Sequence, residues 1–246
     1  MRFARSSFAL LAALSLLAVA GCRTPGAPVP SRSVKSGSKV VSAKPDPMPA
    51  WTDKTAAKLA LIGYVEGSVV RGERGYVPAE DRVAVVSAAL VERVEDPTPL
   101  RQLVGYLSGN GYRVYVVSDG EVASLRKTAR EKLGLAERQV IGAWAETDYV
   151  VRDGRPAVVP RAGAPRTAKP VVIDRVLGGR RPVLAIGAEG SDVAMLEYTT
   201  LANPLPAAAL VAPLGGSAET ARLREEARTR GWTVIDPRAD WAGGSR

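Results

Sequence analysis

Four polar side chains have types and positions that could bind or transfer an anion. Ser87 and Ser118 each end an apolar run, and Lys169 opens a segment of helical period. Asp192 follows a further apolar run and a short loop, and opens the next helical segment. Hydroxyls, an ammonium group and free amides at strand ends can together hold a phosphate group. A weak anion-binding site at Ser118 and Lys169 is therefore expected.

Catalysis by these residues is restricted by what the chain lacks. It contains no histidine, which excludes a Ser-His-Asp triad and any histidine metal site. Lys169 is then the only side chain placed to act as a base toward Ser87. Structural interpretations stay open as well. In these, Ser87 fills space and Ser118 caps a strand end, while Lys169 is an ordinary helix-start residue and Asp192 stabilises a helix dipole.

The elements that must position these residues alternate along the second part of the chain. Apolar runs bounded by turn signals predict strands, and segments of helical period predict helices. The expected strands are 83–90, 113–117, 139–144, 183–186, 209–211 and 233–235, and the expected helices are 99–108, 121–133, 169–177, 192–198 and 218–230. A β-hairpin centred on Asp153-Gly154 is expected over 147–159, set on the sheet. Such alternation predicts an α/β fold, a Rossmann-like three-layer sandwich with a mostly parallel central sheet.

Helix boundaries are marked by specific residues. Thr98, with Pro99 at the first helical position, is expected to cap one helix, and Gly134 is expected to stop the next. Ser217 and Gly231 bracket the last helix in the same way. These signals favour helices that begin and end close to the limits given above.

Three short segments then fall, in order, where a doubly wound sheet places its site. They are 114–120 (VYVVSDG), 168–170 (AKP) and 184–192 (LAIGAEGSD). They resemble motifs II, III and IV of the haloacid dehalogenase superfamily. The flanking segments 48–53 (MPAWTD) and 230–241, which contains RGWTVID, resemble those of exported hydrolases of this superfamily. The resemblance therefore covers nearly all of the domain and implies a phosphatase-like hydrolase fold.

The first motif of that superfamily, DxDGT, should fall in the strand around 82–91. There the resemblance places Ser87 at the position of the nucleophilic aspartate and Ala89 at that of the acid–base aspartate. In motif IV, Ala188 replaces the first metal-binding residue, whereas Asp192 keeps the second. Because the family reaction needs a carboxylate nucleophile, a second acid and Mg²⁺, these replacements predict an inactive site.

Two further expectations follow from the resemblance. Only 92–99 separates the first motif from the next helix, so no cap domain covers the site. No cofactor is expected. Mg²⁺ is expected only if the chain is a hydrolase, and Asp192 would then be a weak ligand, with Glu189 or Asp119 completing the site.

The amino-terminal residues have the pattern of an export signal. Arg2 and Arg5 precede an apolar run that ends in the lipobox Val19-Ala20-Gly21-Cys22. This run is too short for a membrane-spanning helix, and Cys22 is the only cysteine of the chain. We expect cleavage before Cys22 and attachment of lipid, including palmitate, to its thiol. An ordinary signal peptide or a signal anchor with an incidental cysteine is the alternative.

The segment after the signal is rich in Pro, Ser, Gly and Lys, which predicts a disordered tether. The expected organisation is a signal peptide over 1–21, a tether over 22–49 and one domain over 50–246. The whole chain has a formal charge of +9, but the expected domain has 27 basic and 24 acidic side chains, an excess of only +3. A nearly neutral domain without an aromatic stacking pattern argues against nucleic acid as a partner.

The leading expectation is therefore a lipid-anchored protein of the cell envelope that acts as a non-catalytic binding or scaffold module. The alternative is a phosphate-ester hydrolase with an altered active site. The expected partners are the membrane, through the lipid anchor, and an envelope protein or a phosphate-bearing ligand. Arg23 follows the cysteine where an acid often signals inner-membrane retention in relatives of enteric bacteria, which favours the outer membrane, facing the periplasm.

Replacing Cys22 with Ser tests the anchor. Serine cannot accept the thioether-linked lipid, so Cys22→Ser should abolish incorporation of labelled palmitate and leave the protein uncleaved or released from membranes. Metabolic labelling followed by membrane fractionation checks this. Labelling and fractionation equal to those of the unchanged protein would contradict the assignment.

Overall fold

A computed structural model describes residues 46–70, 76–143, 147–160 and 167–242. The chain divides into two units after Lys44, and all the described residues belong to the second, Pro45–Arg246. The expected signal peptide and Cys22 lie outside the described residues. The second unit includes 46–49, which the sequence analysis assigned to the tether, and Met48 is fully buried there. None of the described helices is both long and apolar enough to cross a membrane.

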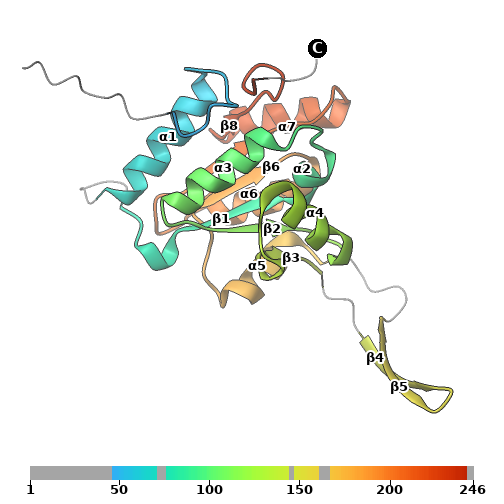
Figure 1. Cartoon of the computed structure of the whole chain (residues 1–246). Coiled ribbons are helices and arrows are strands. Elements are labelled where there is room, and N and C mark those ends of the chain that lie inside the picture. Colours follow the sequence, from blue (N-terminus) through green and yellow to red (C-terminus); the bar gives the residue numbers. More distant parts are fainter. Residues whose placement is uncertain (1–45, 71–75, 144–146, 161–166, 243–246) are drawn as a thin grey trace, which may run out of the picture. The chain divides into compact units, whose positions relative to one another are not determined.

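The centre of the second unit is a six-stranded sheet in the order β3-β2-β1-β6-β7-β8, in which every neighbouring pair is parallel (Figure 1). The strands are β1 Val83–Ser87, β2 Arg113–Val117, β3 Val140–Ile141, β6 Leu184–Gly187, β7 Ala208–Val211 and β8 Thr233–Val234. β1 and β6 are buried along their whole length, as parallel strands covered on both faces must be. The predicted α/β class with a parallel sheet is confirmed.

Helices cover both faces of this sheet. One core cluster contains Ala84 and Val86 of β1 with side chains of α1 Ala56–Val69, α3 Thr98–Gly109 and α4 Ala123–Leu133. The other contains Val85, the residue between them, with side chains of α5 Lys169–Leu177, α6 Val193–Thr200 and α7 Ala218–Thr229. The alternation of β1 side chains between the two clusters produces three layers. The remaining helices are α2 Ala88–Arg93 and the 3-10 helices Ala79–Asp81, Glu137–Gln139 and Gly190–Asp192.

Several predicted boundaries were wrong. The strand expected over 83–90 ends at Ser87, and α2 begins at Ala88. An unbroken buried apolar run has no period that distinguishes a strand from a helix, which explains this error. The strand expected over 139–144 is only Val140–Ile141, and α1 was not predicted. The side chain that caps α3 is Asp96, not Thr98: its Oδ1 accepts the Thr98 amide at 2.9 Å.

Other end signals behave as predicted. Gly134 follows α4 in the left-handed conformation, with φ of 72°, and the Ser217 side chain accepts the Thr220 amide at the start of α7. The hairpin forms from β4 Thr147–Arg152 and β5 Arg155–Pro160, with Asp153 and Gly154 at φ of 51° and 74°. β4 and β5 pair with each other in a two-stranded sheet of their own, so this pairing does not place the hairpin on the six-stranded sheet.

Packing of α1 can be tested with two leucines of the same helix. Leu61 is 1% exposed and Leu59 is 56% exposed. Leu61→Ala should reduce the free energy of unfolding by about 2–5 kcal/mol, because it removes buried apolar area and leaves a cavity. Leu59→Ala should change it by less than about 0.5 kcal/mol. Urea unfolding followed by circular dichroism measures both, and equal effects would contradict the packing of α1 on the sheet.

Candidate functional site

The sequence-predicted residues lie at the carboxyl edge of the central strands. Ser87 is the last residue of β1, Ser118 follows β2, and Ala188 follows β6. β1 pairs with both β2 and β6, so these three strand ends are adjacent. Lys169 is the first residue of α5, and Asp192 is the last residue of the 3-10 helix that leads into α6. The fold therefore gathers segments far apart in sequence at one edge of the sheet.

The closest polar contact at this edge joins Lys169 and Asp192. Lys169 Nζ lies 2.5 Å from Asp192 Oδ1, and the two residues are 3% and 0% exposed. The same ammonium group donates to Ser191 Oγ at 3.0 Å and lies 3.9 Å from Glu189 Oε1. Lys169 is thus surrounded by acceptors from the loop that follows β6. This pairing neutralises the positive charge that was expected to bind an anion.

The second carboxylate oxygen of Asp192 holds the loop after β6. Asp192 Oδ2 accepts the amides of Ala188 at 2.7 Å and Glu189 at 3.0 Å. A side chain at Gly187 would place its Cβ 2.8 Å from the Asp192 Cβ and 3.1 Å from Leu196 Cδ1. Only glycine fits at that position without displacing its neighbours. Asp192 therefore connects the end of β6, the loop and the start of α6.

The two serines differ in their surroundings. Ser87 is fully buried, and its Oγ has no hydrogen-bond partner among the residues that the structure describes. Ser118 is partly exposed, and its Oγ accepts the Gly120 amide at 3.0 Å. Neither serine hydrogen-bonds Lys169 in the described part of the chain. Ala89, expected on a strand, is buried in α2. An unpaired buried hydroxyl costs free energy, roughly 1–3 kcal/mol, which makes Ser87 the least explained residue of this edge.

The carboxylates do not form an Mg²⁺ site as they are arranged. Both oxygens of Asp192 are engaged, one by Lys169 and the other by two amides. Glu189 accepts a hydrogen bond from Ser191 at 2.7 Å and lies 3.7 Å from Arg93. No group of three or more histidine, cysteine or acidic side chains that could hold a metal ion occurs among the described residues. The donor set therefore does not match the several hard oxygen ligands that Mg²⁺ requires.

Sequence reasoning missed two participants, Ser191 and Arg93, and it considered Glu189 only as a possible metal ligand. The segment Glu189-Gly190-Ser191-Asp192 has the spacing of a capping box, in which residues three apart exchange side-chain and backbone hydrogen bonds. That spacing predicts local bonds between Glu189 and Asp192. It contains no signal for Lys169, which is distant in sequence and reaches Asp192 only because α5 begins at the edge where β6 ends.

Removing one partner of the buried ion pair should destabilise the fold strongly. Lys169→Met leaves the Asp192 carboxylate buried without its counter-charge and should reduce the free energy of unfolding by about 3–5 kcal/mol. Lys127→Met, at an exposed lysine of α4, is the matched control and should have little effect. The double variant Lys169→Met with Asp192→Asn should lose less than the sum of the single effects.

Chemical unfolding of five proteins measures these differences: the unchanged protein, Lys169→Met, Asp192→Asn, their double variant and the Lys127→Met control. A Lys169→Met protein as stable as the Lys127→Met control would show that the ion pair does not form.

Comparison with known proteins adds no family to this geometry. No protein-family model matches the chain, and no curated protein is found to be similar to it. The α/β fold with its parallel sheet therefore stands on the structure itself, and any assignment to a family rests on the resemblance of its motifs.

Proposed function

We propose that this chain is a lipid-anchored protein of the cell envelope whose domain has a haloacid dehalogenase-like fold and acts as a non-catalytic binding or scaffold module. The observation that carries the proposal is the ion pair between Lys169 and Asp192. These are the two charged residues that survive in the segments resembling motifs III and IV. Here they bind each other inside the protein instead of facing a substrate.

The residues around the pair agree with a structural role. Ser87, Ala89 and Ala188 occupy the positions of the nucleophile, the acid–base residue and the first metal ligand in the proposed family. All three are buried, and none supplies a carboxylate. Serine without a base is a weak nucleophile, and Lys169 donates its hydrogen bonds to Asp192 and Ser191.

The anchor and the location form the second half of the proposal. Cleavage before Cys22 and lipidation of its thiol would hold the domain outside the cytoplasm, on the outer membrane facing the periplasm. Several acyl chains give far more stable residence than the single chain that binds only marginally. The proposed partners are this membrane and either an envelope protein or a phosphate-bearing ligand. A residual anion site at Ser118 and Lys169 would have to compete with Asp192 for the ammonium group.

A second candidate function is supported by one observation. The Oγ of Ser87 lacks a partner at the strand end where the proposed family places its nucleophile. A hydrolase of phosphate esters that uses this hydroxyl would need a rearrangement that exposes Ser87 and separates Lys169 from Asp192. Mg²⁺ would be required only in this candidate, and the donor set described above does not fit it.

Turnover distinguishes the two candidates. The full-length protein, purified in neutral detergent, should not hydrolyse p-nitrophenyl phosphate or nucleotides above background, with or without Mg²⁺. Steady turnover that disappears in both Ser87→Ala and Asp192→Asn would overturn the non-catalytic proposal in favour of the hydrolase. Turnover that is indifferent to both substitutions would identify a contaminant and leave the strand-end residues without a catalytic role.

A further inference from the structure

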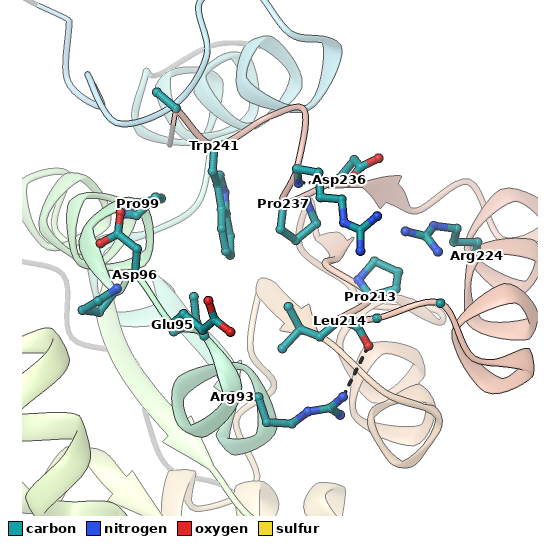
Figure 2. A pocket seen from close by; sticks show the side chains of 16 residues that line it. Arg93, Glu95, Asp96, Pro99, Pro213, Leu214, Arg224, Asp236, Pro237 and Trp241 are labelled. Carbon is teal, nitrogen blue, oxygen red and sulfur yellow. Dashed lines mark hydrogen bonds between the residues drawn. The ribbon is translucent and has the colours of Figure 1, made fainter. Parts of the chain in front are cut away.

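A cavity of about 1000 Å³ lies between the segment that follows α2 and the loops that follow β7 and β8. One wall is formed by the connection between α2 and α3, and another by residues 213–216 and 236–238 (Figure 2). Loops at the carboxyl ends of parallel strands are where α/β sheets bind their ligands. The cavity contains none of the residues matched to the family's four motifs, and only its residues 236–241 lie in a flanking segment that resembles the family.

Two arginines of the cavity wall have unused guanidinium groups. Arg224 of α7 and Arg238, which follows β8, line the cavity, and neither side chain has an ion pair or hydrogen bond within the described part of the chain. Figure 2 shows Arg224 extending from α7 toward the cavity. By contrast, Arg93 donates to the Leu214 carbonyl at 3.3 Å and lies 3.7 Å from Glu189. Arg224 and Arg238 therefore remain available for an oxyanion, which arginine binds through paired N–H donors.

The loop that follows β7 exposes its backbone to the cavity at two glycines. Gly215, with φ of +94°, and Gly216 line the cavity just before Ser217, the N-cap of α7. A Cβ at either glycine would meet no atom within 4 Å, so both border open space. Backbone without side chains at a helix N-terminus allows an anion to approach closely, and the helix dipole favours negative charge there. This loop and the two arginines thus favour the same kind of ligand.

Trp241 is a second feature of the cavity that points to a ligand, because its indole N–H donor is unsatisfied among the described residues. Trp241 is 6% exposed and lines the cavity, and its Nε1 has no hydrogen-bond acceptor within the described ranges. Trp51 packs against it edge to face, with ring centroids 5.9 Å apart. Figure 2 shows the indole extending into the space between Asp96 and Pro237. The ring gives the cavity a flat apolar wall, and its buried N–H is a donor that no acceptor satisfies in the described part of the chain.

Acidic residues limit what can occupy the rest of the cavity. Glu95 and Asp96 lie on the wall opposite Arg224, as Figure 2 shows, and Asp236 lies near the arginines. Asp96 and Asp236 are partly engaged, because their Oδ1 atoms accept the amides of Thr98 and Arg238. Their charges would repel a ligand that is anionic at both ends. A ligand with one anionic group and an uncharged or cationic remainder is compatible with both walls.

We infer that this cavity binds a small organic phosphate, with the phosphate group against Arg224, Arg238 and the amides of the Gly215-Gly216 loop. The apolar part of the ligand packs on Trp241. This site goes beyond the proposed function, since it does not depend on whether Ser87 or Lys169 has any activity. It gives the domain a chemically defined ligand class and a location for it.

Phenyl phosphate is a suitable probe because it combines one phosphate group with one ring. In isothermal titration of the full-length protein in neutral detergent, phenyl phosphate should bind, and phenol at the same concentration should not. Arg224→Gln and Arg238→Gln should each weaken binding on the order of tenfold, through loss of a charge-assisted hydrogen bond. Trp241→Phe, which keeps the aromatic wall and removes the N–H donor, should weaken it less.

Arg222→Gln is the matched control, because Arg222 is an exposed residue of the same helix that does not line the cavity. It should bind phenyl phosphate as the unchanged protein does. Absence of binding to the unchanged protein at millimolar concentration, or undiminished binding in the Arg224→Gln/Arg238→Gln double variant, would overturn the inference. Phosphatase assays report on Ser87 and Asp192 instead, so failure of one proposal is distinguishable from failure of the other.

Discussion

The buried ion pair between Lys169 and Asp192 is the contact on which the carboxyl edge of the sheet depends. Withdrawing two charges from water carries a large desolvation cost, which only close contact and further hydrogen bonds can offset. Asp192 has both: Lys169 on one oxygen and two loop amides on the other. The pair therefore fixes α5 against the loop after β6. Because Asp192 lies so close to the end of β6, only glycine fits at position 187.

This constraint also separates two regions of the same edge. At the ends of β1 and β2, polar groups are buried or satisfied by neighbouring backbone, as at Ser87 and Ser118. Beyond the ends of β7 and β8, by contrast, two glycines and two arginines with no side-chain partner among the described residues border open space. Glu189 lies between the regions, near both Lys169 and Arg93. In the function proposed here, the first region stabilises the domain and the second binds its ligand.

The fold class could be predicted from the sequence because residues that start or end helices are clearly placed along it. Helix α5 was predicted with its observed limits, Lys169–Leu177, since Pro170 lies in its first turn and Gly178 follows in the left-handed conformation. Helix α2 was missed because Ala88–Val91 continues the apolar run of β1. The site was only partly predictable. Its residues could be placed at strand ends, but the bond from Lys169 to Asp192 depends on the spatial order of strands. The arginine-lined cavity carries no sequence motif at all.

The order of the strands has a consequence for how the chain acquires its structure. β1 lies at the centre of the sheet, between β2, which follows it closely in sequence, and β6, which is paired with it through Ala84 and Leu184. Contacts between residues so distant in sequence form late, because a long loop must close first. Until β6 pairs with it, one side of β1 has unpaired backbone groups beside mostly apolar side chains, the kind of edge that joins other chains. A chain shortened before β6 would therefore aggregate instead of forming half a domain.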